Sequence, residues 1–579
     1  MGFPYASFLL GAIDNATVKN AQDPQLRKAA FGLYLQDTWK VTRKLTLDYG
    51  ARWDYQTAAK EMNDRFTMFG PSVPNPSAGG LLGGTTYQGS GPGGCNCYFT
   101  TSYPLAIGPR FGVAYQLDSK TVVRGGWGFI YGTTATTGYL TGTAISGVGW
   151  NQLSFSTGSF GTPAVQLQNG LQFTQAALTV ASRSPGLFPS PGQINSPPYY
   201  IDRSGGRPPR INQWNISAQR QITSNLVVEA AFVGNTGVWL RADSMESLNI
   251  LSPERIASFG LNINNPTDYS LLTSPWNSAA VQARGFKAPY TGYPTGLTLA
   301  QMLRPYPQFG TIPTQWAARG DSWYDSLQTK LTKRVSHGLD ITAAFTWSKE
   351  LQLGATSGTA GAPAVNDILN RYQNKYISAS SQPFVLATGY TYRVPPSGVS
   401  SRLLRNALRD WTLSGMLRYA SGLPILSPAA TNNLTTTLFR GTFANRVPGV
   451  PLFTQDLNCH CINPSKQFVL NPAAWTQPGA GQWGTAAAYY NDYRYQRRPI
   501  EQMSFGRTFQ IREHMTLQFR AEFYNVFNRT EMNNPTSTNA AATQTVNAQG
   551  NATAGFGWIN TGSLFSSPRQ GQMVARFQF

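Results

Sequence analysis

Charged side chains are scarce in this sequence. Asp, Glu, Lys and Arg make up 12% of its 579 residues, whereas soluble globular domains carry about 25%. The length alone favours several soluble domains, but a soluble protein of this size needs more charge on its surface. Aromatic residues reach 12%, and Gly and Pro number 57 and 38. This composition disfavours a soluble multidomain protein.

Long hydrophobic runs are also absent. No stretch of about twenty consecutive apolar residues occurs, so the sequence encodes no transmembrane helix. A chain that crosses a membrane without helices has to form a closed barrel, because lipid cannot hydrogen-bond an open sheet edge. The mean hydropathy of −0.27 is compatible with such a barrel, because half of each strand is polar.

The start of the chain lacks a secretory signal. Residues 1–4, Met-Gly-Phe-Pro, have neither a basic start nor an apolar core behind them. For an exported protein, the simplest explanation is that the chain is the C-terminal part of a longer protein. We therefore expect residues 1–579 to be one partial transmembrane barrel domain, without a plug domain and without a signal peptide.

Catalytic groups are missing as well. The His residues are His337, His460 and His514, and none stands beside a plausible nucleophile with an orienting carboxylate. Gly-rich runs such as residues 89–94 lack the Gly-Lys-Ser/Thr ending of a phosphate-binding loop. The sequence predicts no enzyme activity and no cofactor.

Cysteine is limited to two Cys-x-Cys pairs in long loops, Cys95 with Cys97 and Cys459 with Cys461. An exported protein meets an oxidising compartment, so disulfides are the first interpretation. Spacing does not decide whether they form within or between the loops. A metal site that combines Cys459, His460 and Cys461 with the other pair is the alternative, because thiolate and imidazole suit zinc or copper.

Acidic residues are outnumbered, which gives a net charge of +20. Such a charge fits a surface that faces an anionic environment, such as lipopolysaccharide. Nucleic-acid binding is not predicted, because the basic residues are dispersed and no basic helix or stacking module concentrates them.

A strict alternation of apolar and polar residues is present at residues 45–55, LTLDYGARWDY. A period of two is that of a β-strand. Residues 31–41 form a second strand with a tight turn between, so residues 31–55 are an antiparallel hairpin. Comparable hairpins follow; they lie at residues 109–131, 211–234, 322–351, 384–419 and 500–528. Residues 5–13 read as the end of a further strand, and residues 57–107 as a long loop.

The connections alternate between short turns and loops of roughly thirty to eighty residues, a pattern typical of outer-membrane barrels. We predict an all-β fold, an antiparallel transmembrane outer-membrane β-barrel of about fourteen strands, with short periplasmic turns and long extracellular loops. A soluble β-sandwich is the alternative, but its turns do not alternate in this way. The expected location is the outer membrane of a Gram-negative bacterium.

Charged residues on the polar faces of these strands are expected to face the barrel lumen, and nothing in the sequence ranks them as substrate contacts. They are Asp48, Arg52, Arg124, Glu229, Arg520 and Glu522. The last ten residues, QGQMVARFQF, form an amphipathic strand that ends in an aromatic residue, as outer-membrane barrels do. Its C-terminal assembly signal, which the barrel assembly machinery reads, consists of Met573, Ala575, Phe577 and Phe579.

Several segments together resemble TonB-dependent receptors, and among them the Oar-like branch. They are ASFLLG (6–11), FGLYLQDTWKVTRKLTLDYGARWDY (31–55), GPRFGVAY (108–115), YDSLQTKLTKRVSHGLDITAAFTWSKEL (324–351), LRDWTLSGMLRYASGLP (408–424) and LQFRAEFYNVFNRTEMNNP (517–535). The resemblance implies a barrel of about twenty-two strands with an N-terminal plug. It also implies energy supplied by the TonB complex through a segment near the N-terminus.

This chain departs from that pattern, because it has no plug, no coupling segment and strands for only part of the circumference. The resemblance implies that it is the C-terminal barrel part of a transporter or receptor for a bulky substrate (a siderophore, an oligosaccharide or a peptide). TonB would then act only through the missing N-terminal part. The alternative is an outer-membrane structural or adhesion protein whose long loops bind surface ligands without transport.

Overall fold

The computed structural model describes most of the chain. The described residues are 4–19, 26–62, 64, 66–90, 93–134, 152–156, 163–172, 184–186, 188–189, 192–194, 197–354, 365–395, 401–432, 434–563 and 565–579. No helix among them is long and apolar enough to cross a membrane.

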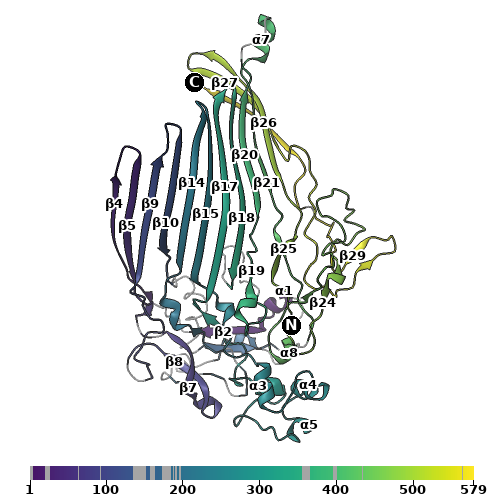
Figure 1. The fold of residues 1–579 in the computed structure, drawn as a ribbon. Coiled ribbons are helices and arrows are strands. Elements are labelled where there is room, and N and C mark those ends of the chain that lie inside the picture. Colours follow the sequence, from purple (N-terminus) through teal and green to yellow (C-terminus); the bar gives the residue numbers. More distant parts are fainter. Residues whose placement is uncertain are drawn as a thin grey trace.

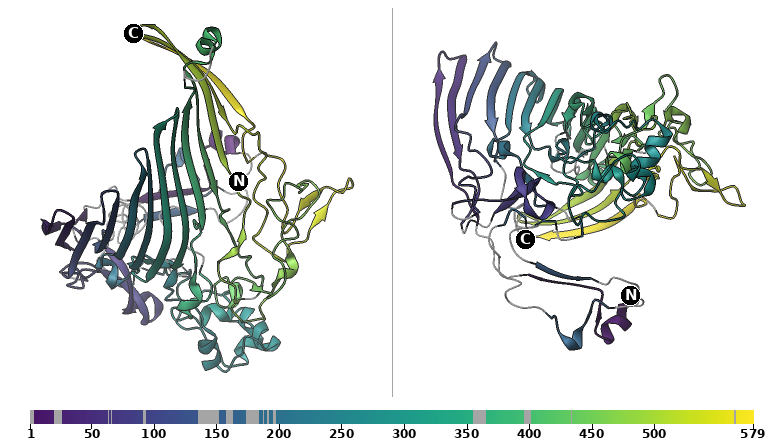
Figure 2. Two further views of the ribbon diagram at one scale, coloured as in Figure 1. Left: turned by 45° about the horizontal axis from the view of Figure 1, so that its top comes forward. Right: turned by 90° about the horizontal axis from the view of Figure 1, so that it is seen from below.

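One large antiparallel sheet dominates the molecule (Figure 1). Its strands pair in the order β30-β27-β26-β21-β20-β18-β17-β15-β14-β10-β9-β5-β4, so each strand lies beside its nearest long neighbours in the chain. The bounds are β4 (Ala30–Lys40), β5 (Leu45–Gln56), β9 (Ala106–Gln116), β10 (Thr121–Tyr131), β14 (Arg210–Thr223), β15 (Leu226–Leu240), β17 (Gly320–Ser336), β18 (Leu339–Leu353), β20 (Phe384–Arg393), β21 (Trp411–Ala420), β26 (Ile500–Arg512), β27 (Met515–Tyr524) and β30 (Gln570–Gln578). Figure 2 shows from below that this row of strands is strongly curved.

The structure confirms the all-β antiparallel class and every predicted hairpin, but it corrects the first strand. Residues 5–13 do not enter the main sheet. Instead, the chain forms helix α1 (Pro4–Leu9), and β1 (Ala12–Ile13) pairs with β12 (Val165–Gln166). The fourteenth strand of the sheet is the short β19 (Lys375–Ile377), which pairs with the loop end of β18.

The two faces of the sheet differ in chemistry. Cross-strand partners share a face, and one continuous row of partners is apolar from β5 to β20. This row contains Leu47, Val113, Gly125, Ile216, Phe232, Leu327, Trp347 and Phe384. Its large side chains are exposed rather than covered by a second layer; Ile216, Phe232, Leu327, Trp347 and Phe384 are among them. An exposed apolar face of this extent suits contact with lipid.

The long loops are not structureless; they form a cap at the end of the sheet opposite the short turns and α7 (Figure 1). Its helices are α3 (Pro253–Ser258), α4 (Pro266–Thr273), α5 (Ala279–Gln282), α6 (Leu299–Met302) and α8 (Leu434–Thr437); α7 is Arg402–Leu408. Its strands are β3 (Leu26–Arg27), β6 (Lys60–Glu61), β7 (Thr67–Asn75), β8 (Leu81–Tyr87), β13 (Tyr200–Ile201), β16 (Thr314–Gln315), β22 (Pro424–Leu426), β23 (Asn445–Arg446), β24 (Trp475–Thr476), β25 (Tyr489–Arg494), β28 (Thr545–Val546) and β29 (Ala552–Ala554). A further pair, β2 (Asn15–Lys19) with β11 (Gln152–Ser156), stands apart from the main sheet.

The cap holds the buried cores of the molecule. One core contains Tyr493, Trp475 and Phe556. Another contains Leu272 of α4 and Leu299 of α6. The expectation of a plain loop at residues 57–107 is wrong, because β7 and β8 form a hairpin there and Phe69 is fully buried. Burial of these apolar side chains stabilises the described parts of the loops.

The last strand places its apolar residues on the apolar face. In the pairing of β30 with β27, Phe577 lies opposite Leu517, Ala575 opposite Phe519 and Met573 opposite Ala521. Phe579 continues the same alternation. Met573 is 91% exposed and Phe579 90% exposed. The role of these side chains in assembly remains a prediction.

Arginine on the apolar face should destabilise the protein, whereas arginine on the polar face should not. We expect Leu327→Arg, in the middle of β17, to cost about 2–4 kcal/mol, as charges at the bilayer midplane do in barrels. The neighbouring Gln328→Arg, whose side chain lies on the other face, is the matched control. Guanidinium unfolding in phospholipid vesicles, followed by heat-modifiable gel migration, measures both. Equal losses for the two variants would contradict the assignment of the lipid face.

Candidate functional site

The register brings all the charged strand residues predicted for the lumen to one face of the sheet. In the first strands, Asp48 of β5 pairs with Gly112 of β9, and Gly112 pairs with Gly126 of β10. Arg124 lies two residues before Gly126 on β10, so it shares this face. In the middle strands, Glu229 belongs to a row of cross-strand partners with Lys330, Ala344, Ala387 and Arg418. Ser414 lies four residues before Arg418 on β21 and therefore on the same face. Ser414 pairs with Ser504 of β26, and Ser504 pairs with Glu522 of β27, so Glu522 shares this face too.

These residues share a face but do not form one cluster. Arg52 pairs with Asp54 at 2.9 Å between Nε and Oδ1. Arg124 donates to Gln219 Oε1 at 2.7 Å, on neighbouring β14. Asp48 accepts a hydrogen bond from the Thr38 hydroxyl at 2.6 Å. Far along the sheet, Arg520 pairs with Glu522. The predicted charges are therefore spread along the polar face, and each one has a local partner or a cross-strand neighbour.

A hollow on this polar face gathers one of them with residues that sequence reasoning missed. Its volume is about 420 Å³, and it lies over β5, β9, β10 and β14. The polar-face residues that line it are Arg52, Asp54, Gly108, Arg110, Gly126, Gly128, Ile130, Gln213 and Asn215. The hollow thus combines guanidinium, carboxylate and amide groups, and Phe111, Trp127, Phe129 and Tyr131 also line it. A few polar groups among apolar ones are typical of a ligand site.

Glycine makes the hollow possible. Gly108, Gly126 and Gly128 occupy polar-face positions of adjoining strands, where any side chain would fill the space. A Cβ on Gly126 would lie 3.0 Å from Asn215 Nδ2, and one on Gly128 would lie 3.2 Å from Arg110 Cβ. The sequence indicates this gap in side chains at GPRFG (108–112) and RGGWG (124–128). There, Gly residues fill polar-face positions, while Phe111 and Trp127 point to the opposite face.

The hollow has an excess of positive charge. Asp54 is paired with Arg52, whereas Arg110 donates to the neutral side chain of Gln36. Arg207 and Arg210 lie outside this lining, 3.5 Å and 4.6 Å from the ring centroid of Trp239, and Arg210 lies opposite Tyr131 on the apolar face. Trp239 holds a φ of +60°, unusual for a non-glycine residue. The arrangement favours a ligand that carries carboxylate or other anionic groups.

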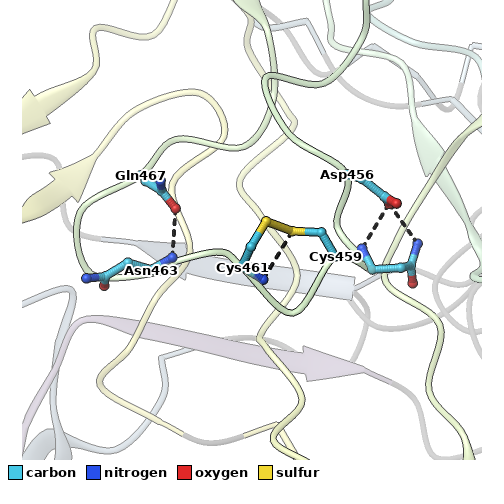
Figure 3. Close-up of a disulfide and its surroundings, with 6 residues drawn as sticks. Asp456, Cys459, Cys461, Asn463 and Gln467 are labelled. Carbon is cyan, nitrogen blue, oxygen red and sulfur yellow. Dashed lines mark hydrogen bonds between the residues drawn. A yellow bond between two sulfur atoms is a disulfide. The ribbon is translucent and has the colours of Figure 1, made fainter.

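The cysteines form two disulfides, each within its own loop: Cys95–Cys97 and Cys459–Cys461. Figure 3 shows the second, where the Cys461 amide donates to Cys459 Sγ at 3.1 Å. In the same loop, the Asn458 amide donates to Asp456 Oδ1 at 2.9 Å. The middle residues Asn96 and His460 both adopt a positive φ, +50° and +55°. Within the described ranges, no group of His, Cys, Asp and Glu could hold a metal ion, so the alternative metal site is not formed.

Comparisons with known proteins place these features in context. A family model described as outer membrane beta barrel domain matches residues 2–572. The chain is similar to the ferripyoverdine receptor of the outer membrane of Pseudomonas aeruginosa, at 10% identity and TM-score 0.36, over 96% of this chain and 40% of the receptor. It is similar to the copper transporter OprC, at 11% identity and TM-score 0.37, over 96% and 50%.

A third similar structure is the ferric citrate transporter FecA, at 9% identity and TM-score 0.38, over 96% of this chain and 46% of FecA. The chain thus spans half of these proteins' length or less. No curated protein matches the chain.

Removal of Asp54 should increase anion binding in the hollow without loss of stability. In Asp54→Asn, the guanidinium of Arg52 loses its carboxylate partner, and an exposed ion pair contributes little to folding. We expect an unchanged guanidinium midpoint and severalfold tighter binding of a small dicarboxylate such as succinate, measured by isothermal titration of the detergent-solubilised protein. Asp48→Asn, on the same strand but outside the hollow, is the control. A gain in both variants would indicate a general charge effect and not a site.

Proposed function

Because the chain belongs to the outer membrane beta barrel domain family, we propose that it is the C-terminal barrel part of a TonB-dependent outer-membrane transporter or receptor. The same match confirms the predicted outer-membrane location. The proposed protein takes up a bulky substrate and catalyses no reaction. Energy for this uptake would come from the TonB complex.

The observation that carries this proposal is the division of the sheet into an apolar and a polar face. A protein that only anchors itself in the membrane needs the apolar row of Phe232, Leu327 and Trp347. It does not need a polar face with hydrogen-bonded charges and a hollow that contains Arg52 and Arg110. Polar groups along one face provide successive hydrogen-bond partners for a hydrophilic solute that leaves water.

The lining of the hollow narrows the substrate class. Two guanidinium groups against one carboxylate favour an anionic ligand, because Arg binds carboxylates with charge-assisted hydrogen bonds. Among the expected substrates, a siderophore, oligosaccharide or peptide with carboxylate groups fits best. The segments that resemble TonB-dependent receptors, above all residues 517–535, support energised uptake.

The alternative is a structural or adhesion protein whose loops bind ligands without transport. Its support is the packed cap, because the loops bury their own cores around Tyr493 and Leu272 and thus present a defined outer surface. Adhesion, however, gives no role to the hollow on the polar face.

Uptake by living cells distinguishes the two functions. In a strain that lacks the gene, we expect the complete wild-type gene to restore accumulation of a carboxylate-bearing siderophore, acidic oligosaccharide or acidic peptide from a labelled panel. An uncoupler of the proton gradient should abolish this accumulation. Arg52→Gln combined with Arg110→Gln should lower uptake about tenfold or more, because two charge-assisted contacts are lost.

Arg124→Gln is the matched control for that experiment. Arg124 lies on the same face but at the turn end of the sheet, outside the hollow. Its loss should leave uptake within about twofold of wild type, because no contact to a ligand in the hollow is removed. Restored attachment of cells to a surface, with no uncoupler-sensitive uptake of any compound, would instead favour the adhesion protein.

A further inference from the structure

A second cavity, of about 540 Å³, lies on the other side of the sheet wall, where the loops meet β20 and β21. Phe384 and Tyr419 line it, and both belong to the apolar face, since Phe384 lies opposite Trp347 and Tyr419 opposite Leu386. The remaining lining comes from loop residues 458, 460, 496, 497, 499 and 529–531 and the end of β21. This cavity therefore opens from the apolar face at the rim of the cap, away from the polar hollow.

A buried ion pair joins the cap to the sheet beside this cavity. The carboxylate of Glu501, at the start of β26, is only 1% exposed. It accepts hydrogen bonds from Arg529 Nε at 2.6 Å and Arg529 Nη2 at 2.9 Å, and from the Tyr419 hydroxyl at 2.8 Å. Nε and Nη2 of Arg529 donate to the Glu501 carboxylate, whereas Nη1 does not take part in this ion pair. Arg529 is thus fixed in place, and the N–H groups of its Nη1 remain available as donors.

The mouth of the cavity carries further basic groups. Arg497 is exposed and has no carboxylate partner within the part of the chain that the structure describes. Its backbone amide donates to Asn458 Oδ1 at 2.8 Å, which ties the segment before β26 to the disulfide loop. The Cys459–Cys461 ring holds His460 in the left-handed conformation, and His460 also lines the cavity.

The acidic groups nearby do not cancel this charge. Glu501 is occupied by Arg529, and Glu531 lies 3.9 Å from Arg498. Burial raises the pKa of the Glu531 carboxyl, so its negative charge is less favoured there. Arg497 remains as the excess cation, with Arg529 Nη1 and the Gln496 and Thr530 side chains as further donors within the lining.

We propose that this cavity binds the phosphate group of an outer-leaflet amphiphile, that is, a phosphorylated lipid such as lipopolysaccharide. The phosphate would accept hydrogen bonds from Arg497 and Arg529, while the acyl chains lie along the apolar face of β20, from Phe384 past Leu386 toward the turns. A cationic site above an exposed apolar surface matches a molecule with an anionic head and apolar tails. The inference requires the outer-membrane location but not transport.

Titration with purified lipids tests this site on the full chain in detergent micelles, read by native mass spectrometry. We expect a bound adduct with diphosphorylated lipid A and about tenfold weaker binding of the same lipid after removal of its phosphates. Arg497→Gln should weaken binding of the phosphorylated lipid about tenfold, since one charge-assisted contact is lost. Arg497 is exposed and outside the ion pair, so this variant should keep its heat-modifiable gel migration.

Arg512→Gln is the matched control, because Arg512 ends the same strand β26 at the opposite side of the membrane. It removes the same charge and should leave lipid affinity unchanged. Equal losses in Arg497→Gln and Arg512→Gln would overturn the site. Inorganic phosphate that binds wild type as tightly as the lipid does would overturn the lipid as its occupant, because the apolar surface would then contribute nothing.

Discussion

The structure depends on the hydrogen-bond ladder between antiparallel strands. Backbone groups in a lipid environment need partners inside the protein. In the described part of the chain, every strand between β30 and β4 has a neighbour on both sides, and β30 and β4 have one each. This requirement fixes the register, and the register fixes the faces, because a shift by one residue would exchange every apolar and polar side chain. The apolar row and the polar hollow are two results of one pairing scheme from β4 to β30.

Alternation in the sequence was sufficient to predict the main sheet. The alternation at residues 45–55 and in the comparable segments predicted every hairpin. A membrane strand faces lipid on one side and water on the other, and this produces a period of two in its sequence. The same reasoning failed at residues 5–13, where an apolar run too short to show a period forms α1 instead. It also failed for the loops. Phe69 and Tyr493 lie in strands of the cap, β7 and β25, and their burial depends on contacts between segments distant in sequence.

The candidate site was predicted only in part. Arg52 was found because it is a charge on the polar face of an alternating strand, but its importance relative to Arg124 or Glu522 depends on the space beside it. That space comes from Gly108, Gly126 and Gly128, which belong to two strands and become neighbours only through the register. Arg110 and Gln213 were missed for the same reason. Likewise, no local pattern links Glu501 to Arg529 and Tyr419, which three separate segments supply.

The cores of the cap contain few side chains from the middle of the main strands, since most of their members come from the loops. The stability of the cap and the insertion of the sheet into the membrane therefore depend largely on different residues. Changes on the outer surface of the cap can accumulate without harm to membrane insertion. Among related sequences, the cap should therefore vary most, while the strands beneath it stay constant.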